Sequence, residues 1–322
     1  MLVITPRRLH LGIIDPTGSL GRRFGSLGVA LEGGYEIRIT PADSLKIEAE
    51  KEDKETIKET IEKLNFEYDT GFGFYIEVRK SIPRHIGLGS TTQLTLGIAM
   101  GILKLLHKDV PVEEVAKILG RGKNSGVGIY AFKYGGFVVD GGVKDSVPPL
   151  LVRKDFPEDW AFLLVIPQVK RGFDEKEEQK IMEKPFGSAS IAKEISYRIL
   201  LGLLPALAEK NIEEFGRYLS TIQTLVGSSF SDFQGGEFRE DIRLIVEFLN
   251  EITYGAGQSS WGPTVYGLIK RAEYQRVASR VAEFLDEQGI KAKIELGIPR
   301  NRGAEVKGES LFLERLIKSV SQ

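Results

Sequence analysis

The chain has 322 residues, which is too long for one small module and suits two domains that each bury a core. Its 44 Lys and Arg residues nearly balance 45 Asp and Glu residues, so the net charge gives no reason to expect nucleic acid or a membrane as partner. The absence of cysteine excludes disulfides, thiolate metal sites and cysteine nucleophiles. Because no signal peptide pattern and no apolar run of roughly 20 residues is present, we expect a cytoplasmic protein.

The first half of the sequence contains both strand and helix patterns. Residues 1–50 alternate apolar and polar side chains over short stretches broken by Gly and Pro, which is typical of strands joined by turns. Residues 54–64 repeat apolar side chains at helical spacing, and alternation returns in residues 71–82. Residues 91–106 predict a central, buried helix. Pro111 marks the first position of a further helix that ends at two glycines.

The second half begins after a proline-marked crossing, where we place the boundary between domains of residues 1–152 and 153–322. Residues 160–167 predict a buried strand, and several helical patterns follow. Strand, helix and strand signals come last, in residues 264–296. This order predicts an α+β sandwich of the ferredoxin-like kind.

A glycine-containing join, IPRHIGLGSTTQ in residues 82–93, precedes the buried helix. Ser90 and Gln93 have the spacing of a capping box, so we expect the helix to begin at Ser90. Gly87 and Gly89 let the backbone approach a ligand, and the free N–H groups of the first helical turn favour an anion. The predicted phosphate-binding residues are Gly87, Leu88, Gly89, Ser90, Thr91, Thr92 and Gln93.

Spacing alone supports a structural turn and a phosphate site about equally. The join is neither a Walker A loop nor G-x-G-x-x-G, because Thr92 stands where the third glycine would be. Arg84 and His85 precede the loop and would add positive charge to it.

Three stretches together resemble the GHMP superfamily, which includes galactokinase, homoserine kinase and mevalonate kinase. IPRHIGLGSTTQ is similar to its second, phosphate-wrapping motif, and SSWGPTVYGL in residues 259–268 is similar to its third. GKNSGVGIYAFKYGG in residues 122–136 resembles the intervening S-G-x-D segment. The resemblance implies a two-domain GHMP-kinase-like fold, with an N-terminal ribosomal-protein-S5-domain-2-like half and a C-terminal ferredoxin-like α/β sandwich.

One departure from the kinase pattern bears on chemistry. In kinases such as mevalonate kinase, the aspartate of S-G-x-D is the base toward the acceptor hydroxyl, whereas Gly128 follows Val127 here. A glycine side chain cannot take a proton. The substitution weakens the case for a kinase. Because homoserine kinase also lacks this aspartate, it does not exclude one.

The N-terminal stretch RRLHLGIIDPTGSLGRRFGSLGVALE, residues 7–32, resembles the opening of the archaeal β-ribofuranosylaminobenzene 5′-phosphate synthases. This resemblance spans most of the chain. It implies condensation of phosphoribosyl pyrophosphate with 4-aminobenzoate or 4-hydroxybenzoate, loss of pyrophosphate and CO₂, a role in methanopterin biosynthesis, and Mg²⁺ as cofactor. The metal ligands are not identified.

The same resemblance implies roles for further residues. Asp15, Arg22 and His10 are the expected catalytic residues, and the expected substrate-binding residues are Arg8, Arg23, Ser125, Gly126, Ser260 and Gly262. Without the resemblance, Asp15 and Thr17 would be interpreted as a turn, and His10 on its strand as a structural histidine. Trp261 and Tyr254 are candidates to stack on a benzoate ring, although aromatic residues more often lie in cores.

Two other functions stay open from the sequence. One is an ATP-dependent small-molecule kinase, and the other is a regulatory GHMP-fold protein that binds a ligand without turnover. The sequence does not distinguish the two benzoates. A homodimer is expected only because dimers are the commonest soluble assembly.

Overall fold

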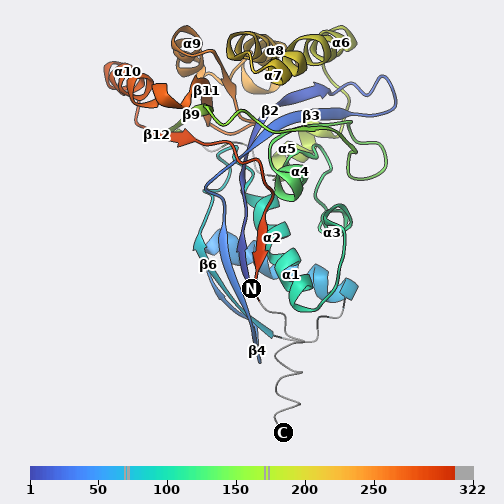
Figure 1. Ribbon diagram of the computed structural model, residues 1–322. Coiled ribbons are helices and arrows are strands. Elements are labelled where there is room, and N and C mark those ends of the chain that lie inside the picture. The colour runs from blue at the N-terminus through green and yellow to red at the C-terminus, as the bar shows by residue number, and fades with distance from the viewer. Residues whose placement is uncertain (69, 71–72, 170–171, 173–174, 309–322) are drawn as a thin grey trace.

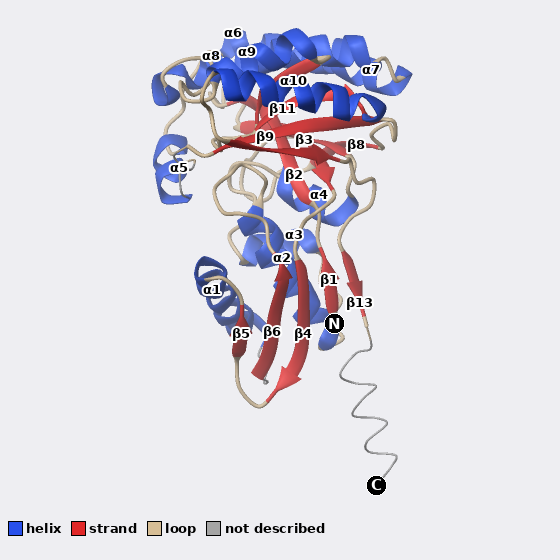
Figure 2. Ribbon diagram, turned by 90° about the vertical axis from the view of Figure 1, so that its left-hand side faces the viewer, coloured by secondary structure: helices blue, strands red, loops and turns tan. Residues whose placement is uncertain are grey.

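The computed structural model describes residues 1–68, 70, 73–169, 172 and 175–308 (Figure 1). The first sheet has the order β13-β1-β4-β6-β5 and is built from both ends of the described chain. Its strands are β1 (Leu2–Ile4), β4 (Glu36–Ala42), β5 (Lys46–Glu48), β6 (Gly73–Lys80) and β13 (Glu305–Lys307). Helices α1 (Lys51–Tyr68) and α2 (Ser90–Leu105) cover one face of this sheet (Figure 2).

A second, antiparallel sheet lies between the two ends of the molecule (Figure 2). Its order is β2-β3-β7-β8, with strands β2 (Arg7–Asp15), β3 (Phe24–Leu31), β7 (Phe137–Asp140) and β8 (Leu150–Lys154). Below it lie α3 (Val112–Ile118) and α4 (Val127–Tyr134). The predicted boundary at residue 153 falls within β8, and β13 returns the chain to the first sheet.

The third sheet, β10-β11-β9-β12, has the strand order and βαββαβ succession of a ferredoxin-like sandwich. Its strands are β9 (Trp160–Pro167), β10 (Gly255–Gln258), β11 (Val265–Lys270) and β12 (Ala292–Gly297). A layer of helices covers it (Figure 1). The helical elements of this half are α5 (Glu175–Met182), α6 (Ala189–Arg198), a π-helical turn (Ile199–Leu203), α7 (Leu204–Glu209), α8 (Ile212–Gln234), α9 (Arg243–Ile252), a 3₁₀ turn (Arg271–Glu273) and α10 (Tyr274–Glu287).

One apolar core joins the two halves. It includes Leu9 and Leu27 of the second sheet, Ile98 of α2 and Phe215 of α8, all fully buried. The ring of Phe215 packs edge-on against Phe137 with 6.1 Å between ring centroids. Because one continuous core supports all three sheets, the segments that meet between the halves are held in fixed relative positions.

The predicted strands at residues 160–167 and 264–270 and the buried helix after residue 90 are confirmed. Pro111 is the N-cap of α3 rather than its first helical residue. Helix α4 was not predicted, and neither was α5. Among the residues that the structure describes, no helix is long and apolar enough to cross a membrane.

Candidate active site

The loop between β6 and α2 requires two glycines in the left-handed region. Gly87 has φ of 89° and Gly89 has φ of 80°. A Cβ atom on Gly87 would lie 2.3 Å from the carbonyl oxygen of Ser259, and one on Gly89 would lie 2.6 Å from Cγ of Arg8. The two glycines therefore let the loop pack directly against both neighbouring segments.

The predicted capping box at Ser90 is wrong. Gly89 takes the N-cap position in left-handed conformation, so Ser90 is the first residue inside the helix and no side chain caps it. The amide nitrogen Nε2 of Gln93 donates instead to the carbonyl oxygen of Gly128 on α4, at 2.8 Å, and the Gln93 side chain is fully buried. Gln93 therefore joins α2 to α4.

A cavity of about 100 Å³ opens over this loop. Five of the seven predicted phosphate-binding residues line it, whereas the buried side chains of Leu88 and Gln93 do not. The five are Gly87, Gly89, Ser90, Thr91 and Thr92. We call this space the loop cavity.

The third motif docks onto the loop through Ser259. Its hydroxyl accepts the backbone N–H of His10 at 3.0 Å and donates to the carbonyl oxygen of Gly87 at 2.7 Å. Ser260, with φ of 53°, and Gly262 line the loop cavity, and their predicted role in substrate binding stays a prediction. The three sequence motifs thus meet at one place, although they lie far apart in the chain.

Among the residues that the structure describes, three charged side chains border the loop cavity: Arg8, Arg121 and Glu178. Nη1 of Arg8 donates to the carbonyl oxygen of Gly87 at 2.7 Å. Burial lowers the pKa of Arg8 to about 10, the carboxylate of Glu178 opposes this, and the charge of Arg121 adds to it. Arg8 therefore remains charged at neutral pH, and the two neighbouring guanidinium groups favour an anionic ligand.

Arg121 and Glu178 were missed by sequence reasoning. Arg121 lies between Gly120 and Gly122, the two glycines that predict the end of the helix after Pro111. Glu178 lies on the unpredicted helix α5. No local pattern in the sequence signals that α5 borders the loop.

His10 is a buried neutral side chain. Its Nδ1 accepts the backbone N–H of Gly12 at 3.3 Å, which assigns the ring proton to Nε2, 3.2 Å from the hydroxyl oxygen of Ser125. Burial lowers the pKa of His10 to about 3, with a further contribution from the charge of Arg8. At neutral pH His10 therefore orients Ser125 rather than accepting a proton.

This pKa predicts how stability depends on pH. Between about pH 6.5 and pH 3 an unfolded chain protonates His10 and the folded chain does not, so acid destabilises the fold by about 1.4 kcal/mol per pH unit through this residue. We expect His10→Gln to remove this contribution. The free energy of unfolding, measured by urea titration at pH 6 and pH 4, should fall less in the variant than in the wild type. An identical fall in both proteins would contradict the buried neutral state.

Asp140 is a buried carboxylate that the sequence did not single out. Its oxygens accept the N–H of Gly126 at 2.8 Å and of Gly142 at 3.0 Å, which fixes the start of α4 beside Ser125. Burial raises the pKa of Asp140 to about 6, and those N–H groups oppose the rise. This shift stabilises the fold as pH falls from about 6 to 4. It therefore partly offsets the acid destabilisation that His10 causes in the wild type.

The predicted residues Asp15, Arg22 and Arg23 lie on the β2–β3 hairpin. Oδ1 of Asp15 accepts the backbone N–H of Thr17 at 2.8 Å and its hydroxyl at 2.5 Å, which forms a turn. Nη1 of the exposed Arg22 donates to the Gly142 carbonyl oxygen at 3.3 Å, and Arg23 donates to the carbonyl oxygens of Pro16, Glu183 and Lys184.

These three hairpin side chains lie apart from the phosphate loop. Within the described chain, the residues that line the loop cavity do not include Asp15, Arg22 or Arg23. The structure therefore does not bring them to the loop. Their catalytic and substrate-binding roles stay predictions.

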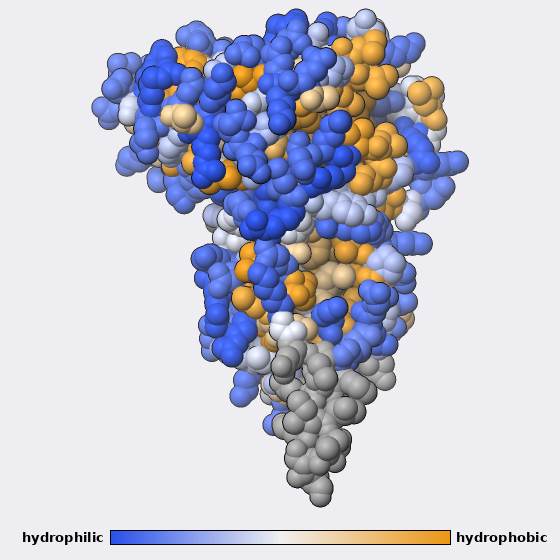
Figure 3. All heavy atoms as spheres, viewed as in Figure 1, coloured by the Kyte–Doolittle hydropathy of each residue, from blue (hydrophilic) through white to orange (hydrophobic). Residues whose placement is uncertain are grey.

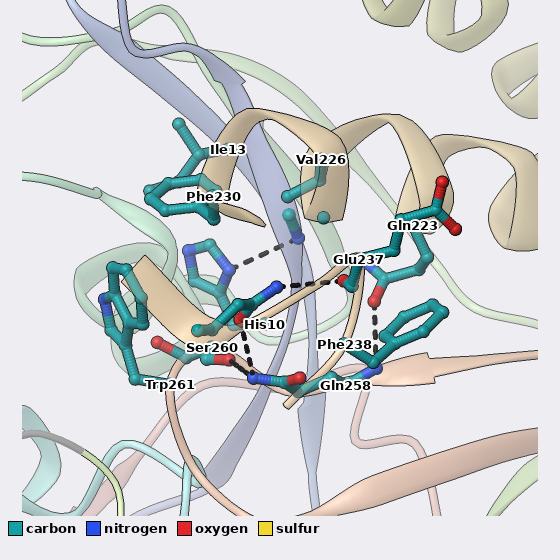
Figure 4. Close-up of a pocket in the computed structure, with 13 residues that line it drawn as sticks. His10, Ile13, Gln223, Val226, Phe230, Glu237, Phe238, Gln258, Ser260 and Trp261 are labelled. Atoms are coloured by element: carbon teal, nitrogen blue, oxygen red, sulfur yellow. Dashed lines mark hydrogen bonds between the residues drawn. The ribbon is translucent and has the colours of Figure 1, made fainter. Parts of the chain in front are cut away.

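An aromatic cavity of about 50 Å³ lies on the other side of Trp261 (Figure 4). Its apolar walls come from Ile13, Val226, Phe230, Phe238 and Trp261. Trp261 packs edge-on against Phe230 with 4.9 Å between ring centroids, and it lines the loop cavity as well. Trp261 and Ser260 thus line both the aromatic cavity and the loop cavity.

A larger cavity of about 430 Å³ lies between α1 and the loop. Arg84, predicted to add charge to the loop, is buried there in an ion pair with Asp53, at 2.6 Å between Nη2 and Oδ1. Its Nη1 also donates to the Thr91 hydroxyl at 3.0 Å. Arg84 therefore connects α1 to the first turn of α2.

Two family models and several known proteins are similar to this chain. Residues 55–136 match the GHMP kinases N terminal domain, and residues 203–290 match the GHMP kinases C terminal domain. The β-ribofuranosylphenol 5′-phosphate synthase of Archaeoglobus fulgidus is 32% identical, over 94% of this chain and 98% of the relative. The protein of the same name from Methanocaldococcus jannaschii is 30% identical, over 95% and 100%.

Solved structures extend this likeness to the fold. Mevalonate kinase of Methanococcus jannaschii superposes with a TM-score of 0.66 at 20% identity, over 93% of this chain and 98% of that chain. The predicted α+β, two-domain GHMP-kinase-like fold is confirmed.

Proposed function

Because the chain belongs to the family of β-ribofuranosylphenol 5′-phosphate synthases, we propose that it joins phosphoribosyl pyrophosphate to a para-substituted benzoate. The acceptor is 4-hydroxybenzoate or 4-aminobenzoate. The phenol in the relatives' name favours the hydroxy acid.

The proposed reaction exchanges two bonds. The bond from ribose C1 to the diphosphate oxygen breaks, and its electron pair leaves with pyrophosphate. The ring carbon that carries the carboxylate forms a bond to C1, and the carboxylate then leaves as CO₂ while its bonding pair restores the aromatic ring. The para hydroxyl or amino group supports this step by donating electron density to the ring. No proton has to be removed from an acceptor hydroxyl.

The observation that carries the proposal is the glycine at position 128. A Cβ atom there would lie 3.1 Å from Cγ2 of Thr92, so the position of the kinase aspartate faces the phosphate loop and offers no base. His10, the other expected acid or base, is neutral and holds Ser125. A transfer driven by departure of a diphosphate fits this site better than proton abstraction does.

The diphosphate would bind at the loop cavity. Backbone N–H groups at the start of α2 and the guanidinium groups of Arg8 and Arg121 would stabilise the negative charge that grows on the leaving group. Ser125 and His10 are uncharged, so they would lie near the ribose without competing with the two arginines for the diphosphate.

Mg²⁺ is part of the proposal. The described residues contain no group of three or more His, Asp or Glu side chains arranged for a metal. An ion that arrives with diphosphate needs only one or two protein carboxylates, however, and Glu178 lines the loop cavity together with Ser90. These two residues would hold Mg²⁺, which would neutralise charge on the diphosphate.

The benzoate ring would bind against Trp261. The aromatic cavity is smaller than the roughly 150 Å³ that holds a benzene ring, so entry of the ring displaces Trp261 or Phe230. We therefore expect 4-hydroxybenzoate to change the tryptophan fluorescence. The only other tryptophan, Trp160, is buried in the core, so Trp261→Phe should abolish the change. A variant that responds as the wild type does would exclude Trp261 from the acceptor site.

The proposed function is tested by incubating the full-length protein with phosphoribosyl pyrophosphate, Mg²⁺ and carboxyl-labelled 4-hydroxybenzoate or 4-aminobenzoate. We expect labelled CO₂ and pyrophosphate in equal amounts. Absence of labelled CO₂ with both acids would reject the synthase. Formation of ADP from ATP with a hydroxyl acceptor would favour the kinase instead.

We also propose a homodimer. Tyr197, Leu200 and Leu201, on α6 and the turn after it, each expose more than half of their surface, and apolar side chains gather in that region at the upper right of Figure 3. Sedimentation equilibrium of the wild type tests the assembly.

A further inference from the structure

A second basic cavity, of about 160 Å³, adjoins the loop cavity. We propose that it binds the 5′-phosphate of the ribosyl donor, an inference that rests on the proposed function. It is lined by Arg8, Thr92, Gly120, Arg121, Gly122, Lys123, Asn124, Ser125, Gly128, Glu178 and Gln179, and we call it the Lys123 cavity.

The segment that carries Lys123 is held rigidly. Gly120 and Gly122 have φ of 70° and 84°, and the backbone N–H of Arg121 donates to the carbonyl oxygen of Ala116 on α3, at 2.7 Å. A Cβ atom on Gly122 would lie 2.9 Å from Cδ1 of Ile129. This turn therefore packs between α3 and α4 and fixes the backbone positions of Arg121 and Lys123.

The walls of the Lys123 cavity favour an anion. Arg8, Arg121 and Lys123 are cationic, and Asn124, Ser125 and Thr92 add hydrogen-bonding groups. Glu178 is the one carboxylate among the lining residues that the structure describes, and it accepts a hydrogen bond from Nδ2 of Asn124 at 3.3 Å. The charge of the walls is net positive, as a phosphate monoester requires.

The arrangement of the two cavities matches a ligand with an anionic group at each end. Four residues line both of them: Arg8, Thr92, Arg121 and Glu178. Phosphoribosyl pyrophosphate carries a diphosphate on C1 and a phosphate on C5, on opposite sides of the furanose ring. With the diphosphate at the loop, the furanose ring would lie beside the four residues that line both cavities. The 5′-phosphate would then reach the Lys123 cavity.

The larger cavity beside α1 is less suited to this phosphate. Three carboxylates, those of Glu52, Glu55 and Glu59, face it. Its Arg84 is already paired with Asp53. Lys63, Arg121 and Lys123 line this cavity too, so the three glutamates balance their charges, whereas the described walls of the Lys123 cavity are net positive. The charge pattern therefore favours the Lys123 cavity for an anion.

A substitution at Lys123 tests the two proposed phosphate sites separately, because Lys123 lines the Lys123 cavity and not the loop cavity. We expect Lys123→Gln to weaken binding of ribose 5-phosphate and of phosphoribosyl pyrophosphate about tenfold or more, and to change pyrophosphate binding less than about twofold. Titration calorimetry on the full-length protein measures all three ligands.

Two further variants complete the test. Lys117→Gln removes an exposed lysine on α3 that lines neither cavity, and it should bind all three ligands as the wild type does. Arg121→Gln removes a residue of both cavities and should weaken all three.

Unchanged affinity of Lys123→Gln for ribose 5-phosphate, or an equal loss for pyrophosphate, would overturn the assignment. If the wild type still releases CO₂ in that case, the proposed function survives. A wild type that neither binds phosphoribosyl pyrophosphate nor releases CO₂ would overturn both.

Discussion

We expect the Arg8→Ala enzyme to lose about 10²–10³-fold in kcat/KM for the ribosyl donor. Arg8 lines both the loop cavity and the Lys123 cavity, and its Nη1 donates to the Gly87 carbonyl oxygen at 2.7 Å. Alanine at this position removes a charge that would stabilise the departing diphosphate, and it also frees the loop. Steady-state release of labelled CO₂ measures the loss.

The neighbouring arginine is the matched control. Arg7 lies next to Arg8 in β2, but its Nη1 pairs with Glu295 at 2.6 Å and its Nε donates to the Glu32 carbonyl oxygen. Arg7→Ala should therefore lower the free energy of unfolding by about 2 kcal/mol and leave kcat/KM within a few-fold of the wild type. Equal activity losses in the two variants would show that Arg8 acts through folding alone.

Gly87→Ala is expected to damage both stability and binding. The added Cβ would meet the Ser259 carbonyl oxygen at 2.3 Å, a backbone atom that cannot move without displacing the third motif. Alanine is also strained at a positive φ. Because the collision and this strain add, we expect the free energy of unfolding to fall by about 3 kcal/mol. Pyrophosphate binding should fall at least about tenfold because the N–H groups of the loop shift.

Gly21→Ala separates strain from collision. Gly21 also has a positive φ, 79°, but a Cβ atom there meets nothing within 4 Å. This variant should lose only about 1 kcal/mol and bind pyrophosphate normally. Urea titration and calorimetry compare the two variants. A similar loss of stability at both positions would argue against the contact between Gly87 and Ser259.

The fold was predictable where a strongly apolar stretch stands between clear turn signals. The strand at residues 160–167 is a continuous apolar run, and the helix after residue 90 has no competing pattern. Helix α4 was missed because it has only eight residues, follows Gly126 and contains Gly128, so its short apolar run does not distinguish a helix from a strand. Pairing of β13 with β1 was beyond reach, since strands of three residues carry little pattern.

The backbone conformation of the candidate site was predictable from the sequence, but the charged side chains around it were not. Gly87, Gly89 and the start of α2 follow from local turn and helix chemistry. Arg121 and Glu178 reach the loop only through tertiary packing. The capping box failed because the sequence pattern cannot show that Gly89 takes the cap position and that α4 offers Gln93 another partner.

The pairing of β1 with β13 has a consequence for synthesis on the ribosome. Residues 2–4 are translated about 300 codons before their partners at residues 305–307. Until then β1 presents an open edge that could pair with another nascent chain. We therefore expect assembly of this sheet to wait until residues 305–307 have left the ribosome.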